Sequence, residues 1–166
     1  GKVDFLLLDE TNNLYVDEEY IFDRARALAV RTKLWNQDPN NTDIKYTLAI
    51  GGMQFSSNPE TLEFEAGEVY NEFVNTAEGG TTNYFYLDGK PLLVCYCQPA
   101  QRSAWESWGG DKSNTNLFTL RWAHSPSVAG TYGWEVREGS IVDEEVMLVM
   151  PGWNNNKGAP ITYREN

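Results

Sequence analysis

The chain has 166 residues, of which 41% are hydrophobic and 13% aromatic, enough for one domain with a sizeable core. Its 24 acidic and 13 basic residues give a net charge of -11, which disfavours binding to a nucleic-acid backbone or an anionic membrane surface. The sequence contains no run of about 18 apolar residues, so we expect no segment to insert into a membrane.

The first 36 residues predict a buried strand followed by an amphipathic helix. Residues 3–9 are continuously apolar from Phe5 to Leu8, as in a strand that is buried on both faces. In residues 18–36 apolar side chains recur at spacings of three and four. Acids gather near the start of this segment and bases towards its end, which matches the helix dipole.

A second strand and helix follow. Residues 44–50 form the next apolar run, which Gly51 and Gly52 close. Asn58 is expected to cap a helix whose first residue is Pro59, because asparagine side chains accept hydrogen bonds from free backbone N–H groups. An apolar stripe then continues as far as Phe73.

Residues 83–97 predict a β-hairpin that turns at Asp88-Gly89, with its second arm as the third central strand. This arm contains Cys95 and Cys97, which we expect to be two buried strand residues without a disulfide or a metal. The remaining predicted elements are a short helix over 99–110, a fourth strand over 116–122 and a fifth strand over 144–150.

Strands that alternate with helices predict an α/β fold with a mostly parallel sheet. We favour part of a (β/α)8 barrel, which typically needs about 250 residues; an open doubly wound sheet is the alternative. Without a clear linker, we expect residues 1–166 to form a single domain, and the abrupt start at Gly1-Lys2 suggests a fragment of a longer barrel. In both folds, ligands bind at the carboxyl ends of the strands.

Polar and aromatic side chains follow the predicted strands. Amides match sugar hydroxyls and flat aromatic rings match sugar C–H faces, so this edge is a candidate glycan site. The candidate substrate-binding residues are Asn12, Asn13, Gln54, Tyr96, Gln98, Arg121, Trp122, His124, Trp153 and Asn154. Asp9 and Glu10 are the candidate catalytic carboxyls, because most glycoside hydrolases use two.

Each candidate also has a purely structural interpretation. Asp9 and Glu10 point to opposite faces while the strand lasts, so at most one faces a substrate directly, and both are able to cap the following turn. Arg121 is expected to pair with one of these acids, and Trp122 is equally suited to packing. No phosphate-binding loop, dinucleotide fingerprint, nucleophile elbow or zinc motif is present, so we expect no cofactor and no metal.

Four segments, in this order and spacing, resemble a family: VDFLLLDETNN, YLDGKPLLVCY, LFTLRW and VMPGWNNN. They resemble part of the bacterial glycoside hydrolases of the endo-α-mannosidase-like group, the family 99-like or WbsX-like proteins, which are often found in gut Bacteroidetes. The resemblance implies an exported barrel, in the periplasm, at the cell surface or secreted, that acts on glycans without a cofactor. The family's catalytic glutamates lie in a later Asn-Glu-Trp-like segment, which this chain lacks, and Glu10 stands where the family motif has tryptophan.

Two functions therefore remain open. One is a glycoside hydrolase-like domain that binds, and with its carboxyl groups hydrolyses, a glycan at the strand ends. The other is a carbohydrate-binding or scaffold domain that lacks the catalytic pair. An incomplete barrel would leave a sheet edge and an apolar face to be covered, which a homodimer would achieve.

Overall fold

The computed structural model describes residues 5–11, 19–51, 58–76, 80, 82–124 and 132–133, and within these ranges the side chains of 19–22, 24, 124, 132 and 133 are left out. The chain divides after Trp122 into two compact units, Gly1–Trp122 and Ala123–Asn166. Each unit is described by itself. The predicted strand over 144–150 lies outside the described residues.

The first unit is built on a parallel sheet. Its central strands are β1 (Phe5–Asp9), β2 (Lys45–Gly51), β4 (Lys90–Tyr96) and β5 (Thr119–His124), the last of which crosses into the second unit. They lie in the order β1-β2-β4-β5, the same as their order along the chain, and β1, β2 and β4 run parallel. The predicted α/β class with a mostly parallel sheet is confirmed.

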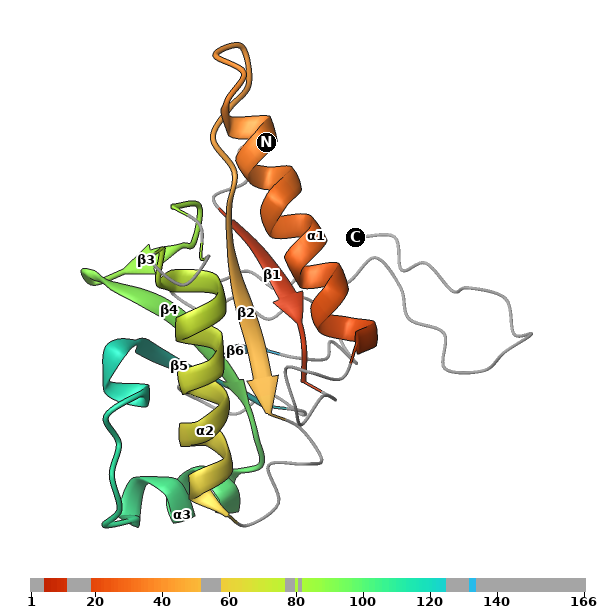
Figure 1. The fold of residues 1–166 in the computed structure, drawn as a ribbon. Helices are drawn as coiled ribbons and strands as arrows, with labels where there is room; N and C mark the ends of the chain where they lie inside the picture. Colours follow the sequence, from red (N-terminus) through yellow and green to blue (C-terminus); the bar gives the residue numbers. More distant parts are fainter. Residues whose placement is uncertain are drawn as a thin grey trace. The chain divides into compact units, whose positions relative to one another are not determined.

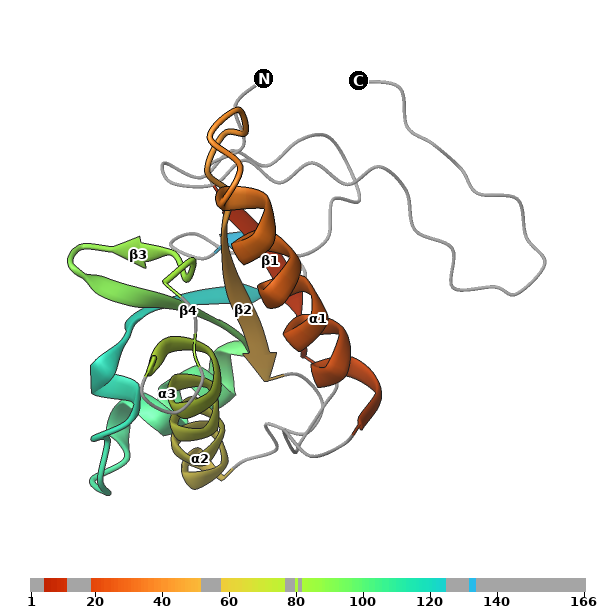
Figure 2. The same ribbon diagram turned by 45° about the horizontal axis from the view of Figure 1, so that its top comes forward.

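Two helices connect these strands, α1 (Glu19–Asn36) between β1 and β2 and α2 (Pro59–Val69) between β2 and β4. Figures 1 and 2 show α1 and α2 side by side on one face of the sheet. This single-sided arrangement follows from topology, because right-handed crossovers between strands added in one direction place every helix on the same face. Neither these helices nor any other in the described ranges has the length and apolarity needed to cross a bilayer.

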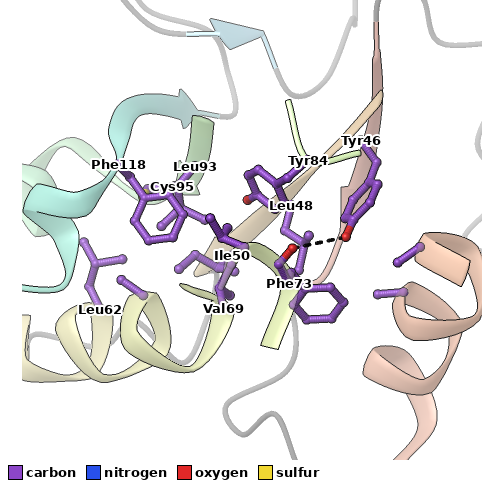
Figure 3. Close-up of a cluster of buried hydrophobic side chains, with 14 of the residues drawn as sticks. Tyr46, Leu48, Ile50, Leu62, Val69, Phe73, Tyr84, Leu93, Cys95 and Phe118 are labelled. Carbon is purple, nitrogen blue, oxygen red and sulfur yellow. Dashed lines mark hydrogen bonds between the residues drawn. The ribbon is translucent and has the colours of Figure 1, made fainter. Parts of the chain in front are cut away.

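The hydrophobic core lies between this helix layer and the sheet (Figure 3). Alternate strand residues point towards the helices, as the two-residue period of a strand requires. The helix-facing strand residues are Leu6, Leu8, Tyr46, Leu48, Ile50, Leu93 and Cys95. They meet Ala25 and Ala29 of α1 and Leu62, Ala66 and Val69 of α2. Each fully buried aliphatic side chain in this layer contributes about 1.5–3 kcal/mol.

Helix α2 begins as its sequence predicts and ends differently. The Asn58 side chain accepts a hydrogen bond from the backbone of Glu60 at 3.1 Å, which confirms the predicted cap. After Val69 the helix widens into a π-helical turn, η1 (Tyr70–Val74), with the Asn75 N–H bonded to the Tyr70 carbonyl. The sequence predicted only a regular helical stripe here.

The predicted hairpin is confirmed. Strand β3 (Tyr86–Leu87) pairs antiparallel with the start of β4. Asp88 and Gly89 between them have φ values of 54° and 81°, as a type I′ turn requires at both central positions. Just before β3, Tyr84 forms a parallel β-bridge with Tyr46, so the segment that leads into the hairpin also pairs with the start of β2.

The region after β4 contains the predicted helix, but its strands differ from the prediction. Helix α3 (Pro99–Ser107) matches the short helix predicted over 99–110. The predicted strand over 116–122 was wrong at its start, because a 3-10 turn, η2 (Thr115–Leu117), precedes β5. In the second unit, the last residues of β5, Ala123 and His124, pair in parallel with β6 (Tyr132–Gly133), which the sequence did not predict.

The turn at η2 has a specific tertiary cause. The buried carboxylate of Glu63 on α2 accepts hydrogen bonds from the backbone N–H groups of Asn114 and Thr115, the latter at 3.0 Å. These bonds satisfy the free donors that open the turn. An apolar strand pattern cannot reveal this partner, because it lies about fifty residues away in sequence.

Candidate functional site

The carboxyl ends of β1, β2 and β4 lie along one edge of the sheet. The register pairs Asp9 with Ala49 and Gly51 with Tyr96. The Glu10 N–H continues the ladder by one residue, bonding to the Ala49 carbonyl at 2.9 Å. Asp9, Glu10 and Tyr96 are therefore brought to the same edge, with β2 between the two acids and the tyrosine, as predicted from parallel strands.

Asp9 is exposed at this edge. By alternation it shares the face of Leu7, opposite to the helix layer. Its Oδ1 atom accepts hydrogen bonds from the Thr11 backbone at 3.1 Å and from the Thr11 hydroxyl at 2.7 Å. This is an Asx turn, so Asp9 closes the strand in the way the structural interpretation described.

Glu10 is a buried acid with an unusual environment. Only 4% of it is exposed, and its Oε2 atom has no hydrogen-bond partner among the described residues. Burial, and then the nearby charge of Asp9, raise the pKa of Glu10 from 4.5 to about 7. The carboxyl group therefore retains a proton close to neutral pH, which an exposed glutamate does not do.

Gly51 closes the same edge through its backbone. Its φ is 99°, in the left-handed region, and a Cβ there would run into the carbonyl oxygen of Tyr96. The sequence marked Gly51 only as a strand end. The structure adds that glycine lets β2 approach the last residue of β4 at the candidate site.

The other described candidates have structural contacts. Gln98 is exposed and precedes α3; its N–H bonds to the Gln101 side chain at 2.7 Å. Arg121 lies mid-strand, and its Nη2 is 3.5 Å from Asp88 in the hairpin turn, a partner that the sequence did not suggest. His124 is the last residue of β5, in the second unit.

Trp122 lies on the helix-facing side of β5 and packs against the core. Its ring centroid is 5.3 Å from that of Trp105 on α3, and the Arg102 guanidinium lies 5.4 Å from the Trp122 ring. The structure thus joins Trp122 to α3. The remaining candidates, Asn12, Asn13, Gln54, Trp153 and Asn154, lie outside the described residues.

Sequence reasoning missed a second buried acid, Glu65 on α2. It is 5% exposed, its Oε2 atom has no hydrogen-bond partner within the described ranges, and desolvation raises its pKa from 4.5 to about 8. The only sequence signal is its position between Leu62 and Ala66 of the apolar stripe, close to the face that packs on the sheet.

Both cysteines are free and buried, as predicted. Among the described residues, no group of three or more histidine, cysteine, aspartate and glutamate side chains is placed to hold a metal ion. Comparison of the chain with protein-family models, with curated proteins and with solved structures gives no match.

Proposed function

We propose that the chain is a glycoside hydrolase-like module that binds a glycan at the carboxyl ends of its strands. We further infer that its sheet is part of a (β/α)8 barrel. The order β1-β2-β4-β5 supports this, because a doubly wound sheet reverses its strand order at a switch point and these strands do not. The placement of α1 and α2 on one face supports it as well.

Glu10 carries the proposal. A carboxyl group at the end of a barrel strand, protonated near pH 7, is the group that a glycosidase uses to protonate the leaving oxygen of a glycosidic bond. On donating its proton Glu10 becomes a carboxylate, which is able to take a proton back from water in a later step. The Oε2 atom is buried without a hydrogen-bond partner among the described residues, which favours the protonated form of the carboxyl group.

Hydrolysis needs a second carboxyl group. Asp9 lies on the opposite face of β1, so the two neighbours do not flank one glycosidic bond while the strand geometry is kept. The second carboxyl group is therefore supplied by another part of the rim. The family resemblance implies instead that both catalytic glutamates lie in a later segment, so the proposed role of Glu10 departs from that expectation.

A non-catalytic glycan-binding domain is the second candidate function. The Asx turn favours it, because the Asp9 oxygen is already engaged by Thr11. In this function Glu10 is a structural acid, and the rim binds sugar hydroxyls without bond cleavage.

Glu10→Gln tests both functions. The amide keeps the shape of the side chain and cannot donate a proton, so we expect hydrolysis of neutral mannan oligosaccharides to fall at least about 100-fold. Asp9→Asn is the matched control at the neighbouring position, with a smaller loss. Product formation and oligosaccharide affinity should be measured for each protein. If the wild type binds the oligosaccharide without hydrolysing it, and Glu10→Gln binds it with the same affinity, the chain is a binding domain. If Glu10→Gln hydrolyses it as fast as the wild type, Glu10 is not the acid.

The proposal carries expectations for location and assembly. An enzyme that acts on external glycans is exported, to the periplasm, the cell surface or the medium. Among the described strands β1 pairs only with β2, so we propose that a further strand pairs with this edge, from a second copy or from another β/α unit. Light scattering on the purified chain distinguishes a dimer from a monomer.

A further inference from the structure

Helix α3, which follows the carboxyl end of β4, carries part of a cluster of two tryptophans and two cations. We call it the tryptophan–cation cluster; its members are Arg102 and Trp105 of α3, Trp122 of β5, and Lys112 in the segment between α3 and η2. The rings of Trp105 and Trp122 meet at 5.3 Å with an interplanar angle of 58°. Arg102 lies over the Trp122 ring at 5.4 Å, and the Lys112 Nζ lies over the Trp105 ring at 4.4 Å.

The cluster holds more hydrogen-bond donors than acceptors. Arg102 uses Nε to bond Glu106 at 2.7 Å, and its two terminal nitrogens make no bond with any described residue. The Lys112 Nζ donates one bond, to the Glu106 carbonyl at 3.2 Å. The Trp105 indole N–H has no acceptor in the described part of the chain.

The charges of the cluster also favour an anionic ligand. Arg102 pairs with the carboxylate of Glu106, whose side chain is 47% exposed, whereas Lys112 bonds a backbone carbonyl. Asp111, the neighbour of Lys112, accepts hydrogen bonds from Ser113 instead. Lys112 is thus a cation without an ion pair among the described residues, on a chain whose net charge is -11. Such a cation attracts an anion, and the arginine fork matches the two oxygens of a carboxylate.

Core packing explains the cluster only in part. Trp105 and Trp122 pack against the hydrophobic core, which accounts for the position of both rings. Cation–π attraction accounts for the two cations over those rings. Neither effect gives an acceptor, among the described residues, to the Arg102 terminal nitrogens or to the Trp105 indole N–H, which costs about 1–3 kcal/mol when buried. A bound acceptor would satisfy these donors together.

We propose that the tryptophan–cation cluster binds the carboxylate of a uronic acid unit in a glycan. The Arg102 terminal nitrogens and the Lys112 ammonium bind the carboxylate. The assignment rests on the proposed function in naming a glycan as the ligand. The anionic part of the assignment rests on the donors and charges of the cluster alone.

Binding of tetragalacturonate and of neutral mannotetraose, measured by calorimetry at low and at physiological salt, tests this assignment. We expect tetragalacturonate to bind more tightly, and its affinity to fall as salt rises. Arg102→Gln should weaken tetragalacturonate binding at least about 10-fold and leave mannotetraose binding unchanged. Lys33→Gln, which removes one exposed charge from α1, is the matched control and should change neither.

Glu106→Gln is expected to raise the affinity for tetragalacturonate, an effect that a misfolded variant would not produce. Removing this carboxylate frees Arg102 and ends its repulsion of the ligand, so tetragalacturonate should bind several-fold more tightly. The proposal is overturned if tetragalacturonate binds no better than mannotetraose, or if Arg102→Gln and Lys33→Gln reduce its binding equally.

The two proposals fail separately. Mannotetraose hydrolysis that depends on Glu10, without any preference for tetragalacturonate, retains the proposed function and refutes the uronate site. Tetragalacturonate binding that depends on Arg102, without hydrolysis of either glycan, retains the uronate site and refutes the enzyme. Circular dichroism of each variant confirms that the comparisons are between folded proteins.

Discussion

The stability of the fold should decrease as pH rises because of Glu65. Its pKa is 4.5 in an exposed setting and about 8 in the buried position on α2. Between these values the unfolded chain has released the proton and the folded chain still holds it. Folding then takes up a proton, so the free energy of unfolding falls with pH. At about 1.4 kcal/mol per pKa unit, the loss at pH 8 is of the order of 4–5 kcal/mol.

Replacing Glu65 with glutamine removes this titration while keeping the shape of the side chain. Urea unfolding of both proteins, followed by tryptophan fluorescence from pH 5 to pH 8, measures the difference in unfolding free energy. We expect that difference to move in favour of Glu65→Gln by about 3–4 kcal/mol across this range. Glu10 titrates near pH 7 in both proteins, so its effect cancels.

Glu68→Gln is the control for this experiment. Glu68 lies three residues further along α2 and is partly exposed, so its replacement should leave the pH dependence close to that of the wild type. If Glu65→Gln and the wild type lose stability in parallel as pH rises, then Glu65 is not a buried neutral acid in the folded chain and the reasoning is refuted.

Two further substitutions test the contacts that shape the sheet edge and η2. Gly51→Ala places a Cβ against the Tyr96 carbonyl at a positive φ, and should lower the melting temperature with a cost of about 1–3 kcal/mol; an unchanged melting temperature would contradict the close approach. Glu63→Ala leaves the N–H groups of Asn114 and Thr115 without their acceptor and should cost about 2–4 kcal/mol in urea unfolding, against little change for Glu60→Ala in the exposed first turn.

Local features of the fold could be predicted because each depends on residues close together in the chain. The type I′ turn needs positive φ at both central positions, which the pair Asp88-Gly89 tolerates. The start of α2 needs a side-chain acceptor and a residue without a free N–H, which Asn58 and Pro59 supply. The alternation of strand and helix patterns then determined the α/β class.

Predictions failed or stayed incomplete where a distant residue decides the conformation. The strand expected from residue 116 starts later because Glu63 of α2 holds the preceding turn. The π turn after Val69 lies against Tyr46, whose hydroxyl donates to the Phe73 carbonyl at 3.4 Å (Figure 3). Periodicity within a segment carries no information about such partners.

The sequence by itself determined that polar groups follow the strands, and that Asp9 and Glu10 would point to opposite faces of β1. Only the tertiary structure decided that Glu10 is buried with a pKa raised to about 7 and that Trp122 packs with Trp105 of α3. A pKa depends on how much water and charge surrounds a carboxyl group, and a ring contact depends on which elements meet. Both are set by the packing of segments that are far apart in the chain.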